Sequence, residues 1–305
     1  MSAAQNPLQD QISSQDSKAA RIKIIHEPSA AEPFVVLSKP AGLASAPLVA
    51  GGESALTECA RLFPEALTVR GKKTVEGGLL HRIDTATSGL LLVAASQEFY
   101  DHISAAQERG LFVKGYRAEC NIDADNARKL GGFPELENVF QDQNCAAAFW
   151  SCHKSLQGLE ISSYFRAFGK GQKEVRPVLP TSNAAALKKL GSKKMYSTKI
   201  VAADFLVIQN FSGGDDRAKI ARVECKIAQG YRHQVRCHLA WLGLPVVGDA
   251  LYNARFAQSK EGADGAAMNA ADGQGGMRFC AASLEFPGLV GKKIFRFDLD
   301  EPRGV

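Results

Sequence analysis

The sequence HRIDTATSGLLLVA, residues 81–94, decides how this chain is organised. GLLLVAAS, which begins within it, is a β-compatible apolar run that predicts a buried strand, and LLHRI predicts a second strand before it. The small polar turn DTATS separates the two runs. A charged side chain, Asp84, is therefore expected at the point where a buried strand ends.

Short strands and helices are predicted on both sides of this stretch. Before it, RIKIIHE and FVVLSKP have the composition of strands, and apolar residues at helical spacing predict a helix over 56–63. After it, Ser96 is a suitable N-cap for a helix that stops at Gly110, and FVKGYRAEC returns as a strand.

The C-terminal half continues the pattern. MYSTKIVAA and DFLVIQNF predict two adjacent strands, and residues 221–227 alternate as in a half-buried strand. Gly230 is expected to open a helix that Gly243 ends, and FCAASLEF and KIFRFDL complete the sheet. Because strands follow strands in several places, the pattern predicts an α+β fold with flanking helices and a largely antiparallel mixed sheet.

Three segments do not share this regular pattern. Residues 1–20 are polar and aperiodic, which predicts a mobile leader before one domain at 21–305. Residues 121–195 are expected to form a loop-rich and basic excursion, and residues 262–276 are a Gly- and Ala-rich loop. The sequence contains no internal repeat.

The charge of the chain is concentrated in one place. The 305 residues carry 37 Lys and Arg against 32 Asp and Glu, so the net charge is only +5. Residues 166–199, in contrast, hold nine basic residues and a single acidic one, Glu174. This segment is either a solvated surface or a contact face for phosphates.

The cysteines and the apolar runs bear on the compartment. Seven scattered cysteines, an odd number, argue against a disulfide framework and favour a reducing cytosol. The first residues lack the apolar segment of a signal peptide, and no apolar run reaches the roughly 18 to 20 residues that span a bilayer. A cytoplasmic protein without a membrane partner is expected.

Three short motifs suggest other chemistries. HRID resembles a kinase catalytic loop, but the residue before Asp84 is extra and no phosphate-binding glycine loop accompanies it. Ser151 and Lys154 form an S-x-x-K without its partner motifs. His233, Cys237 and His238 crowd one helix and could ligate zinc, although no second pair stands at ligand spacing, so packing and capping roles are favoured.

Four motifs in order point elsewhere: SKPAGL at 38–43, HRIDTATSGLLLVA, the Tyr of KGYRAE at 114–119, and GYRHQVRCHLAWLGLPVVGDALY at 230–252. Together they resemble the RluA-type family of pseudouridine synthases. The motifs cover 49 residues, but they spread over most of the chain. Ile83 replaces the usual Leu, Tyr231 and Arg232 replace the usual Arg and a small polar residue, and Asn253 stands in place of Gly.

The resemblance implies a function and the residues that perform it. Uridine in RNA would be isomerised without a cofactor or a metal, in a cleft that carries the catalytic carboxylate of Asp84. Arg236 would lie against that carboxylate, in a bidentate pair if the geometry allows, and keep it ionised. Tyr116 would stack on the target base. Arg82 would fill the stack that the flipped base leaves.

Docking of RNA is the less well matched part of the resemblance, because residues 121–195 fit the family pattern poorly. The expected substrate-binding residues in the basic segment are Lys188, Lys189, Lys193 and Lys194. The partner is expected to be structured RNA, either rRNA or tRNA, and the protein a monomer. Lys39, Pro40, Asp249 and Tyr252 are assigned to the scaffold, with Asp249 tying a turn.

Two rival functions remain open at this point. A catalytically silent RNA-binding protein would keep the basic face and lose Asp84, Tyr116 or Arg236, all of which are present. A metal-dependent hydrolase would act through the His and Cys side chains at 233–238, and would require a metal.

Overall fold

A computed structural model describes residues 21–49, 52–123, 126, 129–131, 133, 156–209, 217–256 and 276–300. The leader at 1–20, most of the loop at 262–276 and residues 134–155 of the excursion lie outside these ranges. Within them, no helix is both long and apolar enough to cross a membrane.

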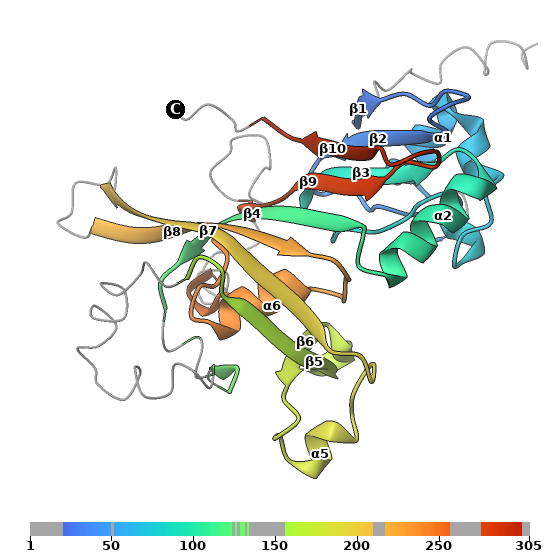
Figure 1. The fold of residues 1–305 in the computed structure, drawn as a ribbon. Coiled ribbons are helices and arrows are strands. Elements are labelled where there is room, and N and C mark those ends of the chain that lie inside the picture. The colour runs from blue at the N-terminus through green and yellow to red at the C-terminus, as the bar shows by residue number, and fades with distance from the viewer. Residues whose placement is uncertain are drawn as a thin grey trace, which may run out of the picture.

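The described strands form one continuous sheet (Figure 1). Their order is β1 (Lys23–His26), β2 (Phe34–Lys39), β3 (Ser88–Ala94), β9 (Phe279–Pro287), β4 (Val113–Asn121), β8 (Arg217–Ile227), β7 (Tyr196–Gln209), β5 (Glu160–Phe168) and β6 (Glu174–Val178), with β10 (Ile294–Asp298) paired to β9. All pairs are antiparallel except β3 with β9, which meet in parallel at Ser88 and Gly89. The predicted α+β class and largely antiparallel sheet are confirmed.

The parallel contact depends on a glycine. Gly89 has φ +122°, and a Cβ there would lie 2.2 Å from the carbonyl oxygen of Ala281. Only glycine allows the two backbones to approach this closely. Asp84 lies five residues before this point, so the contact helps to fix the loop that carries it.

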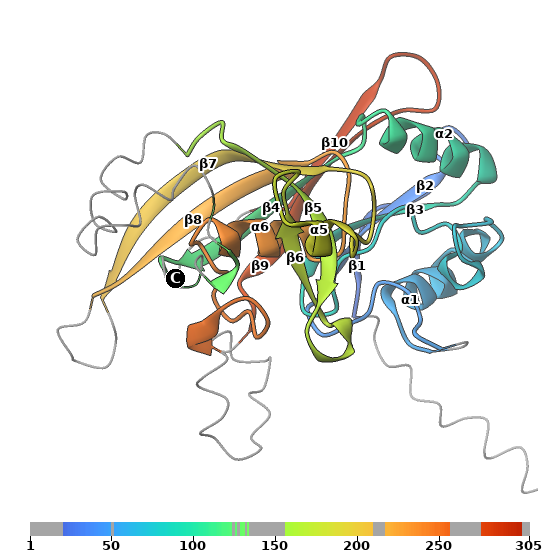
Figure 2. The same cartoon turned by 90° about the horizontal axis from the view of Figure 1, so that it is seen from below.

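Two helices cover opposite faces of β2 and β3 (Figure 2). On one face, α1 (Ala55–Leu62) packs Leu56 and Cys59 against alternate strand residues such as Leu37. On the other, α2 (Gln97–Glu108) packs Phe99 against the residues in between. This alternation follows from the period of two in a strand, and it explains why GLLLVA is apolar throughout.

A third helix, α6 (Gln234–Trp241), packs on the other half of the sheet, against β4 and β8. Its residues Val235 and Leu239 join Ala118, Cys120 and Val223 in a separate apolar cluster. Tyr116 packs against both this cluster and the one under α1. The junction of the two halves therefore lies at Tyr116, in the middle of the sheet.

Most predicted elements are present, but three predictions of an element or its bounds were wrong. LLHRI is not a strand: only Leu79 forms an isolated bridge, to Val93, because side-chain contacts hold the following residues as a loop. The two strands predicted over 195–211 are one strand, β7, with a register shift after Ile200. The helix expected from Gly230 begins at Gln234, since His233 takes a left-handed conformation.

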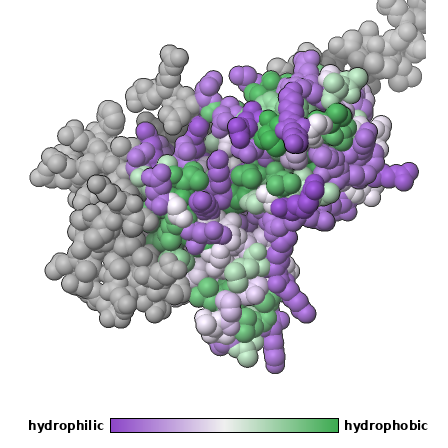
Figure 3. Space-filling model, in the orientation of Figure 1, coloured by the Kyte–Doolittle hydropathy of each residue, from purple (hydrophilic) through white to green (hydrophobic). Residues whose placement is uncertain are grey.

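The basic segment 166–199 forms a lobe of its own. It comprises the end of β5, β6, the short helix α5 (Ala184–Leu187) and the residues that lead into β7. Figure 3 shows this lobe with long hydrophilic side chains beside an apolar patch. The excursion predicted at 121–195 is thus partly regular, because β5, β6 and α5 lie within it.

Candidate active site

The loop that carries Asp84 is held by residues 42–45, at the end of SKPAGL and just after it. The Ser45 hydroxyl accepts from the Ile83 amide (3.1 Å) and donates to the Ile83 carbonyl (2.8 Å). The Gly42 amide donates to the Thr85 carbonyl at 2.7 Å. These contacts bracket Asp84 on both sides, so its backbone has little freedom.

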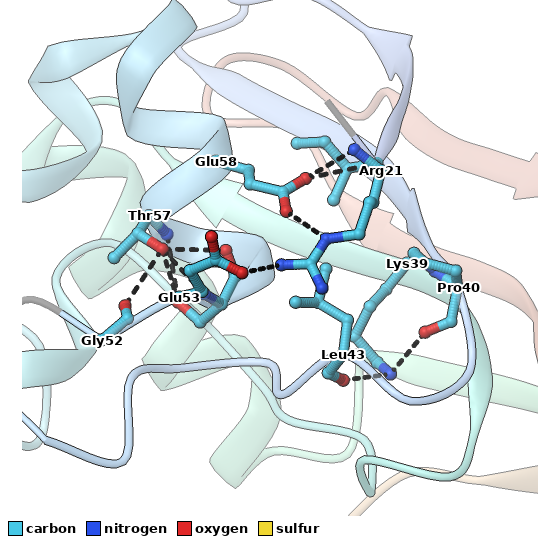
Figure 4. A network of polar contacts seen from close by, with 10 residues as sticks. Arg21, Lys39, Pro40, Leu43, Gly52, Glu53, Thr57 and Glu58 are labelled. Carbon is cyan, nitrogen blue, oxygen red and sulfur yellow. Dashed lines mark hydrogen bonds and ion pairs between the residues drawn. The ribbon is translucent and has the colours of Figure 1, made fainter. Parts of the chain in front are cut away.

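Lys39 stabilises the same loop through hydrogen bonds from its side chain to backbone carbonyls. It is fully buried, and its Nζ donates to the carbonyl oxygens of Pro40 (2.9 Å), Leu43 (2.6 Å) and Thr85 (3.2 Å). Burial lowers the pKa of Lys39 to about 8, although the charge of Asp84 opposes this shift. Figure 4 shows Lys39 among its carbonyls, beside the ion pairs of Arg21 with Glu53 and Glu58. The scaffold role expected of Lys39 fits these contacts.

Arg236 joins Asp84 to a second carboxylate. Its Nη1 donates to Asp84 Oδ2 at 2.6 Å, while Nε and Nη2 donate to the two oxygens of Asp249 at 2.8 and 2.7 Å. The bidentate pair considered for Asp84 is therefore made with Asp249. Asp249 Oδ1 also accepts from the amides of Leu251 and Tyr252, so this residue ties the turn as predicted and orients Arg236 as well.

Of the two carboxylates in this network, Asp84 is the one with an oxygen that Arg236 does not bind. Burial acts to lower the pKa of Arg236, but the hydrogen bonds and charges of Asp249 and Asp84 outweigh it and raise the pKa above its usual value. One permanent cation thus lies between two carboxylates. The fully buried Asp249 takes up most of its donors. Asp84, whose side chain is 27% exposed, keeps Oδ1 free to react.

Tyr116, on β4, lies beside the Asp84 carboxylate. Its ring stacks on Phe279, with centroids 5.2 Å apart and planes 5° from parallel. Burial raises the pKa of Tyr116 well above its usual value, and the charge of Asp84 adds to the shift. The phenol therefore stays protonated near Asp84. The structure brings Asp84, Arg236 and Tyr116 together from segments far apart in the sequence, as the resemblance implied.

The other expected binding residues lie outside this network. Arg82 is exposed and forms an ion pair with Glu76 at 2.9 Å. The four lysines expected to bind RNA follow α5 and are exposed, and within the described chain no carboxylate lies in ion-pair distance of them: Lys188, Lys189, Lys193 and Lys194.

The sequence interpretation missed the position of His233. Its Nε2 lies 3.8 Å from Asp84 Oδ1, and its Nδ1 lies 3.0 Å from the Tyr252 hydroxyl. The HQVR motif gave a signal, because His233 precedes Arg236 by three residues. The sequence suggested a zinc ligand or, in preference, a capping or packing role for His233, and nothing in it indicates a left-handed residue there.

The side chains proposed for a metal point to separate partners. Cys237 Sγ contacts the Val175 carbonyl, and the His238 ring lies between the hydroxyls of Thr198 and Ser163, both at 2.9 Å. His233 faces Asp84 instead. Among the residues that the structure describes, no group of three or more His, Cys, Asp or Glu side chains is placed to hold a metal ion.

Comparison with known proteins defines the family. Residues 33–241, more than half of the chain, match the RNA pseudouridylate synthase family, and the chain belongs to this family. Its members are isomerases that act on RNA. The match includes the residues of the network from Asp84 to Arg236, and Asp249 follows it.

Individual relatives agree with this assignment. The chain is 28% identical over 221 residues to tRNA pseudouridine(31) synthase of Saccharomyces cerevisiae, covering 72% of this chain and 44% of the relative. It is 22% identical over 180 residues to the chloroplastic RNA pseudouridine synthase 2 of Arabidopsis thaliana, covering 59% and 31%. The chain thus spans less than half the length of these relatives. Human RNA pseudouridylate synthase domain containing 1 has the same fold, with TM-score 0.56, 18% identity, and 93% and 84% of the two chains covered.

Proposed function

We propose that this protein converts uridine to pseudouridine in structured RNA, either tRNA or rRNA. The observation that carries the proposal is the carboxylate of Asp84, which Arg236 binds through Oδ2 and not through Oδ1, close enough to Tyr116 for its charge to raise the pKa of that phenol. The reaction breaks the bond from ribose to the base nitrogen, turns the base and rejoins it through carbon. It therefore needs neither a redox cofactor nor net hydrolysis.

Asp84 begins the reaction as an ionised carboxylate. It acts either as a nucleophile on the nucleotide or as a base that takes a ribose proton and gives a glycal-like intermediate. Arg236 binds and orients this carboxylate in both routes. The flat ring of Tyr116 offers a surface for the base and a hydroxyl near the new carbon linkage.

The target uridine reaches Asp84 only after it leaves its stack. Flipping costs a few kcal/mol of lost stacking, which protein contacts must offset. Arg82 has the exposure that such a role needs, with 57% of its side chain accessible. Its guanidinium is the group we assign to the vacated position, where a planar cation stacks well on neighbouring bases.

The lysines after α5 dock the RNA next to this site. A loop connects the two places: a Cβ at Gly191 would lie 2.0 Å from the Tyr231 hydroxyl, and Tyr231 stacks on Phe165 at 5.0 Å. Arg232, the next residue, donates to the carbonyls of Gln172 and Glu174, and His233 after it faces Asp84. Residues 231–233 thus connect the lobe to Asp84, so phosphates bound along the lobe would lie near the reacting carboxylate.

The test is replacement of Asp84 by Asn, which keeps the shape and removes the charge. Incubated with total tRNA and with rRNA, the wild type should form pseudouridine that mass spectrometry detects. Asp84→Asn should lower the rate at saturating RNA by at least about 1,000-fold. Its RNA affinity should stay within a few-fold, because one charge is a small term in a phosphate-driven interface. Asp298→Asn, which changes an exposed carboxylate on β10, serves as control and should keep the full rate. A wild type that is inactive on both RNA pools would overturn the proposal.

A further inference from the structure

One ring nitrogen of His233, Nδ1, lies at hydrogen-bond distance from Tyr252, and the other, Nε2, faces Asp84. The Val175 amide donates to the Tyr252 hydroxyl at 2.9 Å, and that hydroxyl lies 3.0 Å from His233 Nδ1. On the far side of the ring, Nε2 lies 3.8 Å from Asp84 Oδ1. This Oδ1 is the oxygen that Arg236 does not bind.

The hydrogen bonds define which nitrogen of His233 carries the proton. Burial raises the pKa of Tyr252 well above its usual value, so the phenol keeps its proton. The hydroxyl already accepts from Val175, and among the described residues His233 Nδ1 is the acceptor placed to receive its proton. Nδ1 is then the acceptor, and the proton of the neutral ring is on Nε2, directed at Asp84.

The ring is neutral although four charges surround it. Burial lowers the pKa of His233, the charges of Arg236 and Arg232 lower it further, and those of Asp84 and Asp249 oppose them. A protonated ring would form a second ion pair with Asp84 and reduce its reactivity. A neutral ring supplies a hydrogen-bond donor without that cost.

The backbone places His233 in a conformation that it would not take by itself. Its φ is 57° and its ψ 15°, in the left-handed region that residues other than glycine rarely adopt. Such outliers gather where a side chain must be aimed. In this chain, the outlier aims the imidazole at Asp84 instead of continuing α6 by one residue.

The distance between His233 and Asp84 is too long for a hydrogen bond and suits a bridging hydroxyl. A direct bond would span about 2.7 to 3.2 Å. An oxygen located about 2.8 Å from both Nε2 and Oδ1 would accept a hydrogen bond from Nε2 and donate one to Oδ1. A carbonyl could not do both, and neither could an ether. The pair therefore selects a hydroxyl group.

We propose that His233 Nε2 and Asp84 Oδ1 together bind the ribose 2′-hydroxyl of the target nucleotide, which makes His233 a residue that selects ribose over deoxyribose. This inference rests on the proposed function, since attack on ribose C1′ and removal of a proton from C2′ both bring the sugar to Asp84, and the 2′-hydroxyl is attached to C2′. The 2′-hydroxyl is also the donor and acceptor by which a protein distinguishes RNA from DNA. Binding it positions the sugar before the base bond breaks.

The experiment uses two synthetic copies of an RNA stem-loop that the wild type modifies, one with uridine and one with 2′-deoxyuridine at the target position. The wild type should lose about 10- to 100-fold in kcat/KM on the deoxy copy. His233→Gly removes the imidazole and accepts the positive φ, so the protein should unfold at no lower temperature. For this variant the deoxy penalty should shrink by at least about threefold, because one of the two hydroxyl contacts is already absent.

Further variants separate recognition from folding. His233→Gln, which keeps a side-chain donor, should restore part of the penalty, and Tyr252→Phe, which removes the group that fixes the proton, should reduce it. His102→Ala on α2 is the control and should keep the wild-type penalty. An equal penalty in the wild type, His233→Gly and Tyr252→Phe would overturn the inference while leaving the proposed function intact. A wild type without activity on any RNA would overturn both.

Discussion

Asp84 and the lysines of the lobe are both charged groups to which we assign a role toward RNA, yet their surroundings are opposite. Asp84 belongs to a largely buried network in which Arg236 and Asp249 are 5% and 0% exposed, and the three hydrogen bonds that Arg236 donates to the two carboxylates are 2.6, 2.7 and 2.8 Å long. Lys188 and Lys194 extend into solvent without ion-pair partners in the described chain. The first arrangement fixes an atom in place, and the second provides charge over an area.

This difference determines what each region can contribute. A buried, hydrogen-bonded charge interacts strongly and at one position, which suits a reaction at a single ribose carbon. Exposed lysines act through release of counterions, so they supply affinity with little geometric demand. Changes in the network should therefore affect the rate and the folding free energy, and changes in the lobe should affect binding and its salt dependence.

The largest effect is expected from Arg236→Met. It leaves the buried Asp249 without its cation, so the free energy of unfolding should fall by about 3 to 5 kcal/mol, and the rate should fall by at least about 100-fold. Urea unfolding and single-turnover assays measure the two effects. Arg296→Met is a matched control, because its ion pair with Glu285 is exposed, and it should change stability by less than about 1 kcal/mol. Equal losses in the two variants would remove the contrast between the regions.

The next effect concerns the lobe. Replacing Lys188, Lys189, Lys193 and Lys194 by Ala should weaken RNA binding and flatten the slope of log affinity against log salt by up to about three units, since each phosphate contact contributes roughly 0.7 to 0.9. The rate at saturating RNA should stay the same. Ala at Lys23 and Lys292, two exposed lysines elsewhere, should leave the slope as it is. An unchanged slope in the fourfold variant would show that the lobe is a solvated surface.

A smaller effect follows from two histidines of the scaffold, the fully buried His238 and the partly buried His81. Burial lowers the pKa of both His81 and His238 to about 3, below the usual 6.5. Their neutral forms stabilise the fold fully above pH 6.5, and this contribution is lost as the pH falls toward 3, at about 1.4 kcal/mol per pH unit for each ring. His81→Gln should therefore reduce the pH dependence of the unfolding free energy between pH 4 and 6, whereas the lysine variant should not. The same slope in His81→Gln as in the wild type would contradict this.

The smallest effect is expected from removal of metals. The network of Asp84, Arg236 and Tyr116 supplies a charge, a counter-ion and a ring without a metal ligand set, so dialysis against a chelator should leave the rate unchanged within about twofold. Pseudouridine formation before and after dialysis measures this. A loss that zinc restores would show that pseudouridine formation requires a metal and would contradict this account.

Local patterns predicted the elements better than their connections. The alternation in β8, the cap at Ser96 and the apolar run of β3 were sufficient, because period and capping depend on neighbours in sequence. LLHRI failed because its backbone bonds to Ser45, 38 residues away. No periodicity shows such a contact.

The sequence predicted those site residues to which the family resemblance assigns a role in the reaction. Asp84, Tyr116 and Arg236 were named from motifs, and the structure brings them together. Asp249 was assigned to a turn, and its bond to Arg236 was missed because one residue makes both contacts. The role of His233 depends on a left-handed backbone that the sequence does not indicate.

The central claim is that chemistry at Asp84 and docking at the lysines are separable, and one pair of single-turnover rates tests it. Asp84→Asn and the fourfold lysine variant are each measured at RNA concentrations that saturate them. The account predicts that Asp84→Asn forms no detectable pseudouridine and that the lysine variant reacts at the wild-type rate. Pseudouridine formed by Asp84→Asn at a rate near that of the wild type would contradict it.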